Sequence, residues 1–152
     1  MLVKNKNKNK LLLIERVLLL KSLSIFIHTP ENVLAEVAHL MYELEVEENE
    51  EIVTEGEVGN CMFIIYSGEV RVHKENYTLA TLKEKDFFGE LALLDTETRS
   101  ATVTAKTHCI LYRIDQEPFY DLMEFRPEVV KGVVQSLCKR LRDLNYLFLN
   151  KT

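Results

Sequence analysis

Short runs of alternating or β-branched residues, separated by turn residues, fill the middle of the chain. They begin at Glu43, where acidic and apolar side chains alternate, and the last run ends at Ile114. Runs of this length, joined by Gly, Asn, Asp and Glu turns, are typical of antiparallel strands that must pack against a second sheet. We therefore expect a mainly β fold over residues 43–115, an antiparallel β-roll of jelly-roll type (a double-stranded β-helix) with flanking helices. The expected strands are Glu43–Glu47, Met62–Tyr66, Glu69–His73, Leu79–Leu82, Thr98–Thr104 and Cys109–Ile114.

Helices are predicted before the strands. The stretch Leu11–Lys21 has the apolar spacing of an amphipathic helix. The tripeptide Thr-Pro-Glu at residues 29–31 has the order of an N-cap, a first-position proline and a first-turn acid, so we expect a second helix that continues to about Tyr42. Residues 11–42 are thus assigned to N-terminal helices, and residues 1–10, which are rich in Lys and Asn, to a flexible tail.

Two further helices are predicted after the strands, over residues 116–150. Asp115 can cap a helix that runs through Phe125, and Pro127 should end it, because the residue before a proline is pushed out of the helical region. In the last helix, apolar residues fall at heptad spacing and form what we call the seam. Two interpretations of the seam stay open, namely packing on the β-roll and a parallel homodimer contact. The seam residues are Val130, Val134, Leu137, Leu141, Leu144 and Phe148.

Composition narrows the possible functions. The net charge of −5 argues against an extended nucleic-acid-binding face. The three cysteines and four histidines are not clustered, which predicts no disulfide framework and no metal site, and disfavours a metal-dependent cupin enzyme on a similar jelly roll. The acids of Glu43–Glu57 are interpreted as solvated strand faces. The run Leu11–Leu20 contains two charged residues, is too short for a membrane span and lacks a cleavage site, so we expect a cytoplasmic chain without a signal peptide.

Residues 88–103 carry the candidate binding chemistry. Gly89 allows the backbone to come close to a ligand, and a short helix-compatible run follows it, whose first N–H groups would face an anion. Glu90 only accepts hydrogen bonds, which suits a sugar hydroxyl. The guanidinium of Arg99 is a fixed fork of donors, which suits a phosphate. An acid and an arginine in this arrangement indicate a sugar phosphate.

The same stretch resembles the phosphate-binding cassette of the cyclic-nucleotide-binding domain family, which includes the catabolite activators and the regulatory subunits of protein kinase A. The Phe-Gly-Glu at residues 88–90, an Ala-Leu-Leu turn and the Arg-Ser-Ala-Thr-Val at residues 99–103 recur at this spacing in the family. The glycines and apolar residues of Ile52–Gly68 also resemble a family pattern. One departure is Lys85, where the family usually has glycine, so this turn must be built without a positive φ or with a strained lysine.

The resemblance implies a single regulatory domain, residues 11–150, that binds a 3′,5′-cyclic nucleotide, uses no metal and is not an enzyme. It implies cAMP or cGMP as the ligand, and we favour cAMP because Asn145 lies about where relatives cap the purine and its amide suits the adenine amino group. It further implies that binding moves the C-terminal helix and that the effector domain belongs to a partner or to another part of a larger polypeptide. The residues implied in binding are Phe88, Gly89, Glu90, Leu91, Ala92, Arg99, Ser100, Ala101, Arg140, Leu144 and Asn145.

Three alternatives stay open beside this interpretation. A degenerate cyclic-nucleotide-binding fold can serve as a protein-interaction module without a ligand, although the presence of Glu90 and Arg99 argues against it. The chain can also be the regulatory fragment of a larger transporter or signalling protein, which would place it on the cytoplasmic side of a membrane. A haem- or oxygen-sensing relative is disfavoured because no thiol precedes Cys61.

Overall fold

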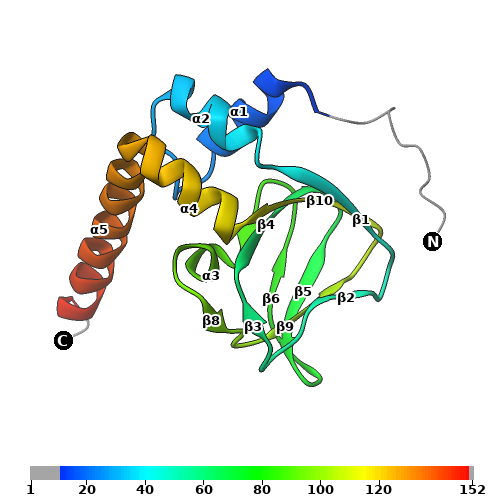
Figure 1. The fold of residues 1–152 in the computed structure, drawn as a ribbon. Coiled ribbons are helices and arrows are strands. Elements are labelled where there is room, and N and C mark those ends of the chain that lie inside the picture. The colour runs from blue at the N-terminus through cyan, green and yellow to red at the C-terminus, as the bar shows by residue number, and fades with distance from the viewer. Residues whose placement is uncertain (1–10, 151–152) are drawn as a thin grey trace.

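The computed structural model describes residues 11–150, and the predicted tail at residues 1–10 lies outside them. A β-roll forms one body of the molecule, and helices from both ends of the chain gather against one end of it (Figure 1). No helix among the described residues is both long and apolar enough to cross a membrane. The helices are α1 (Leu13–Lys21), α2 (Glu31–Ala38), α3 (Glu90–Leu94), α4 (Gln116–Phe125) and α5 (Pro127–Leu149).

The strands pair only antiparallel and form two four-stranded sheets within the described residues, in the orders β1-β10-β4-β7 and β2-β9-β5-β6. The short strands β3 and β8 pair with each other beside α3. This jelly-roll-like arrangement with flanking helices confirms the predicted fold class. The strands are β1 (Tyr42–Val46), β2 (Glu51–Val53), β3 (Val58–Gly59), β4 (Cys61–Ser67), β5 (Val70–Lys74), β6 (Tyr77–Leu82), β7 (Phe87–Phe88), β8 (Glu97–Thr98), β9 (Thr102–Ala105) and β10 (Cys109–Asp115).

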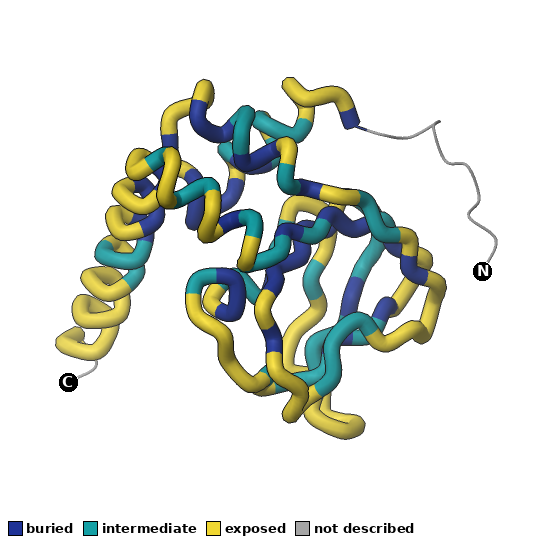
Figure 2. The backbone as a smooth tube through the Cα atoms, viewed as in Figure 1, coloured by how far each residue is buried: buried dark blue, intermediate teal, exposed yellow. Residues whose placement is uncertain are grey.

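Two apolar clusters hold the fold together. One fills the space between the sheets and includes Phe63 and Phe88, whose rings stack with centroids 5.1 Å apart. The other lies between the β-roll and the helices and includes Phe26 and Phe119, whose rings meet edge to face. Each fully buried side chain of this size contributes about 1.5–3 kcal/mol. Figure 2 shows these buried segments in the interior and the exposed far end of α5.

Three local expectations were wrong. The second helix ends at Ala38 instead of Tyr42, because Tyr42 pairs with Arg113 of β10 and opens a strand. Its N-cap position is Pro30, while Thr29 is fully buried and makes no capping hydrogen bond. The strand expected over Thr98–Thr104 divides into β8 and β9, and the loop between them presents the cassette residues.

The turn at Lys85 is built with a strained lysine. Its φ is +71°, in the left-handed region that favours glycine, and its N–H donates to the carbonyl of Ile65 at 2.9 Å. This hydrogen bond links the turn to the central strand β4, which explains how the strained conformation is retained.

Helix α5 packs mainly on α4 and on the N-terminal helical segment. Its buried side contains Gly132, Val133 and Ser136, and the Ser136 hydroxyl donates to the carbonyl of Ile25 at 3.1 Å. Beyond Arg140 every described residue of α5 is exposed. The interpretation in which the seam packs on the β-roll is therefore wrong. The exposed seam residues are Val130 at 39%, Val134 at 50%, Leu141 at 60%, Leu144 at 61% and Phe148 at 78%, and only Leu137 is partly buried.

Candidate functional site

The guanidinium of Arg99 lies in a slot between two glycines. A Cβ atom added to Gly59 would lie 2.2 Å from Nε of Arg99, and one added to Gly89 would lie 2.6 Å from Nη1. Cys61 also holds the guanidinium, because Nη2 donates to its carbonyl at 3.0 Å and to its Sγ at 3.3 Å. Within the described residues, Nε and Nη1 make no hydrogen bond, so this part of the fork remains for another acceptor.

The backbone at Gly89 brings the cassette helix to Arg99. Gly89 has a φ of +81°, and it occupies the N-cap position of α3. This left-handed conformation is open to glycine and costly for residues with a Cβ. The short helix is anchored by Ala92 and Leu93, both fully buried. The turn therefore places Glu90 beside the arginine slot on a rigidly packed element.

Glu90 is linked to the C-terminal helix. Its Oε1 accepts a hydrogen bond from Nη1 of Arg140 at 2.9 Å, and the two side chains are 20% and 31% exposed. Arg140 also donates to the hydroxyl of Ser24, at 3.3 Å. The acid that we expected to accept a sugar hydroxyl thus shares its charge with an arginine of α5, which connects the cassette to that helix.

A cavity of about 160 Å³ opens next to these groups. One of its walls is apolar, because Val53, Val103 and Val72 lie opposite one another across strands β2, β9 and β5. The polar part of the lining consists of Glu90, Glu97, Arg99 and Ser100. A ligand with a flat apolar part and an anionic hydroxylated part matches this division. The lining residues are Val53, Val72, Phe88, Gly89, Glu90, Leu91, Glu97, Arg99, Ser100, Ala101 and Val103.

A second arginine near this site is already engaged. Arg113 and Arg99 both line a neighbouring hollow, but Nε of Arg113 donates to Asp115 at 2.7 Å. Burial lowers the pKa of Arg113, but the hydrogen bond to Asp115 and nearby charges outweigh it, so the pKa lies above its ordinary value. Burial and a hydrogen bond to the same carboxylate raise the pKa of Tyr42 to about 12. Arg99 is therefore the arginine of this region that is placed for a ligand.

The structure brings most of the predicted site residues together but not all of them. Ala92 is buried beneath the cavity, Arg140 contacts it only through Glu90, and Leu144 and Asn145 are exposed on α5 and do not line it. The predicted residues that line the cavity are Phe88, Gly89, Glu90, Leu91, Arg99, Ser100 and Ala101.

Sequence reasoning did not assign roles to three groups at this site. Gly59 belonged to the family pattern, but its position beside Arg99 depends on the pairing of β3 with β8. Cys61 gave no signal, because a single thiol in an apolar strand is usually a core residue. The wall valines alternate as in any half-buried strand, so no local pattern distinguishes them from ordinary core residues.

Comparison with known proteins identifies similar domains. The family model for the cyclic nucleotide-binding domain matches residues 43–125. The chain is 42% identical over 80 residues to a cAMP-dependent protein kinase regulatory subunit of Yarrowia lipolytica, covering 51% of this chain and 21% of that protein. It is 35% identical over 88 residues to a cGMP-dependent protein kinase, isozyme 2, of Drosophila melanogaster, covering 58% of this chain and 8% of that protein. The match thus spans only a small part of these relatives.

Solved structures show the same architecture. The N-terminal domain of a transcriptional regulator from Streptomyces coelicolor A3(2) superposes with a TM-score of 0.80 at 25% identity, covering 88% of this chain and 97% of that one. A cAMP-bound structure of PfPKA-R superposes with a TM-score of 0.65 at 27% identity, covering 88% of this chain and 47% of that one. The β-roll with its helices is therefore an arrangement that other proteins share.

Proposed function

The chain belongs to the cyclic nucleotide-binding domain family, and we propose that its cavity binds cAMP, with Arg99 on the cyclic phosphate and Glu90 on the ribose 2′-hydroxyl. The observation that carries this proposal is the slot of Gly59 and Gly89, which leaves part of the Arg99 fork open toward an anion. The valine wall supplies the surface against which a purine packs. In this role the domain is regulatory and not catalytic, and it acts in the cytoplasm.

Calorimetric titration with cAMP and cGMP tests the ligand and the base together. We expect a dissociation constant of ~1 μM or tighter, on the order of −8 kcal/mol. Arg99→Ala removes the cation opposite a buried monoanion and should weaken binding by at least about 2 kcal/mol, roughly thirtyfold. Equal affinities of the variant and the wild type would refute the assignment of Arg99 to the binding site. No heat with either nucleotide would favour the alternative, a protein-interaction module without a ligand.

The preference for cAMP rests on two relatives. The Yarrowia lipolytica relative is cAMP-dependent, and the PfPKA-R structure contains cAMP. The Drosophila melanogaster relative is a cGMP-dependent kinase at 35% identity, so cGMP is the second candidate. A tenfold tighter binding of cGMP would overturn the preference and leave the phosphate site intact.

We propose that binding is transmitted to α5 through α3. The Glu90–Arg140 ion pair ties α3 to α5, while Tyr120 and Gln116 of α4 donate to the carbonyls of Leu94 and Ala92. A ligand that draws Glu90 toward a ribose hydroxyl changes the partner of Arg140, and a movement of α3 is passed to both C-terminal helices. The ligand shifts α5 only by its differential affinity for the two positions.

Hydrogen exchange measures this transmission. Amide exchange over residues 128–148 should slow when cAMP is added, because a helix that closes over the base loses solvent access. The matched control is Arg140→Gln, which removes the link and leaves the cavity lining unchanged. The same slowing in that variant would contradict transmission through the Glu90–Arg140 pair and leave the contacts of α4 as the route. No slowing in the wild type while calorimetry shows binding would contradict both.

The exposed seam is proposed as a homodimer contact. Its apolar side chains exceed what a monomer ordinarily leaves in one stripe. Sedimentation of the wild type against Leu141→Lys, with and without cAMP, tests it, since a buried lysine would dissociate the pair. A wild type that is monomeric at roughly tens of micromolar in both conditions would rule the seam out as a homodimer contact. The helix would then be expected to bind the effector region or partner protein that receives the signal.

A further inference from the structure

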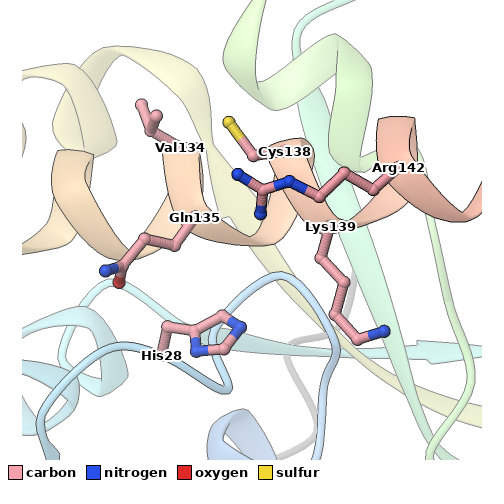
Figure 3. Close-up of a pocket in the computed structure, with 6 residues that line it drawn as sticks. All are labelled: His28, Val134, Gln135, Cys138, Lys139 and Arg142. Atoms are coloured by element: carbon pink, nitrogen blue, oxygen red, sulfur yellow. The ribbon is translucent and has the colours of Figure 1, made fainter.

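A groove lies outside the cyclic nucleotide site, between α5 and the turn that connects α1 to α2 (Figure 3). Its volume is about 410 Å³, and we call it the basic groove. Its lining contains two cations, an imidazole and an amide, and no acidic residue. The size falls in the range of ~300–1,000 Å³ that is typical of small-molecule sites. The lining residues are His28, Val134, Gln135, Cys138, Lys139 and Arg142.

The two walls of the basic groove are held at a fixed distance. Before His28 in the sequence, the carbonyl of Ile25 accepts a hydrogen bond from Ser136 of α5. Directly after His28, Thr29 packs closely on Gly132 of α5, and a Cβ added to Gly132 would lie 2.4 Å from Oγ1 of Thr29. Buried contacts on both sides of His28 therefore attach this turn to α5. The backbone of the two walls is thus preorganised, which lowers the part of the entropy cost that comes from placing the walls.

The donors of the basic groove are available. Within the described residues, His28, Gln135 and Arg142 make no hydrogen bond or ion pair, while Lys139 pairs with Asp143 at 3.0 Å. The two side chains of that pair are 65% and 61% exposed. An ion pair so exposed is weak and exchanges readily for a stronger acceptor. In Figure 3, Gln135 and Lys139 extend from α5 toward the loop that carries His28.

We propose that the basic groove binds a phosphate monoester group. A phosphate monoester carries a charge of about −1.5 to −2, so it can face Arg142 and also compete with the single carboxylate of Asp143 for Lys139. The Arg142 fork and the side chains of Gln135 and His28 supply further donors for the phosphate oxygens. Val134 and Cys138 offer an apolar surface to the group that carries the phosphate.

A bound phosphate in this position would bridge two segments that are far apart in the sequence. His28 belongs to the N-terminal segment, and Lys139 and Arg142 belong to α5. The anion would therefore hold α5 against the turn between α1 and α2. Because α5 also carries Arg140, the groove is a second position from which the helix can be fixed.

Titration by amide NMR tests the proposal, with inorganic phosphate as the probe and chloride used to keep the ionic strength constant. The titration is carried out in the wild type and in Arg99→Ala, because the cassette arginine is a competing anion site. We expect phosphate to shift the amides of residues 28 and 134–142 in both proteins. Arg142→Gln should weaken this binding at least about fivefold. Lys131→Gln is the matched control, since it removes an exposed α5 charge that does not line the groove.

The outcomes separate the explanations. Shifts confined to residues 88–101 that vanish in Arg99→Ala and persist in Arg142→Gln would overturn the proposal. Equal losses in Arg142→Gln and Lys131→Gln would also overturn it, because they would show general attraction to a basic helix. A second titration with N-acetyl-O-phosphoserine amide distinguishes the sources. Tighter binding than inorganic phosphate indicates a phosphorylated protein segment, and equal binding indicates a free phosphate.

Discussion

Substitution of Gly59 by alanine tests whether the arginine slot controls ligand affinity. The new Cβ would lie 2.2 Å from Nε and 2.4 Å from Cζ of Arg99, whereas nonbonded heavy atoms approach to about 3.5 Å. The guanidinium must therefore move by more than about 1 Å. A movement of that size is enough to break its 3.0 Å hydrogen bond to the carbonyl of Cys61.

The expected loss is in affinity and not in stability. The displaced guanidinium loses one charge-assisted hydrogen bond to the phosphate, about 1.5–3 kcal/mol, which weakens cAMP binding roughly 10- to 150-fold. Gly59 has no positive φ, so alanine fits its backbone and gains up to about 1 kcal/mol, which offsets the roughly 1 kcal/mol lost with the hydrogen bond between Arg99 and Cys61. The variant should thus bind weakly while its unfolding temperature stays close to that of the wild type.

Gly56→Ala is the matched control. Gly56 has a φ of +88° and nothing within 4 Å of an added Cβ, so the cost is backbone strain of about 1 kcal/mol without a clash at Arg99. Alanine keeps the N–H that donates to the backbone carbonyl of Arg99 at 2.9 Å. This variant should lose stability and keep its affinity, which is the reverse of Gly59→Ala. Calorimetry with cAMP and thermal unfolding followed by circular dichroism measure both quantities. Wild-type affinity in Gly59→Ala would refute the view that the absent side chain positions the guanidinium.

Three further predictions concern other positions. Lys85→Gly should raise the unfolding free energy by about 1 kcal/mol, because it relieves a φ of +71°, and Lys85→Ala should show no such gain in thermal unfolding. Glu90→Gln should weaken cAMP clearly but scarcely affect 2′-deoxy-cAMP in calorimetry, and equal losses would show that the carboxylate acts elsewhere. A maleimide should label the half-buried Cys138 before Cys109, because burial raises the pKa of the Cys109 thiol and covers it, and mass spectrometry of the labelled peptides measures the order.

The fold was predictable because its signals are local. The strand runs from Glu43 to Ile114 and the break at Pro127 depend on alternation and backbone restriction, which the sequence shows directly. The division of Thr98–Thr104 was not predictable, because β-branched residues favour a strand throughout and only pairing with β3 and β5 decides where it stops.

The orientation of α5 was missed for a different reason. Heptad counting selected large apolar residues, whereas the buried side of α5 includes Gly132 and Ser136. Glycine lets the helix approach Thr29, and the serine hydroxyl satisfies a buried carbonyl at Ile25. Small and polar residues mark a close helix contact only when the opposing surface is known. The site shows the same limit, since Glu90 and Arg99 are motif residues but the partner of Glu90 comes from a helix fifty positions away in the chain.

Helix α5 carries residues that contact both proposed sites. Arg140 contacts Glu90 at the cyclic nucleotide cavity, and its neighbours Lys139 and Arg142 line the basic groove. Residues within one helical turn move together, so any rotation of α5 that changes one contact changes the other. If a phosphate in the groove alters the affinity for cAMP by some factor, cAMP must alter the affinity for phosphate by the same factor. Measuring cAMP affinity with and without phosphate, and phosphate affinity with and without cAMP, therefore closes a cycle. Two equal factors different from one would establish the coupling through α5, while factors of one would show two sites that share a helix without communicating.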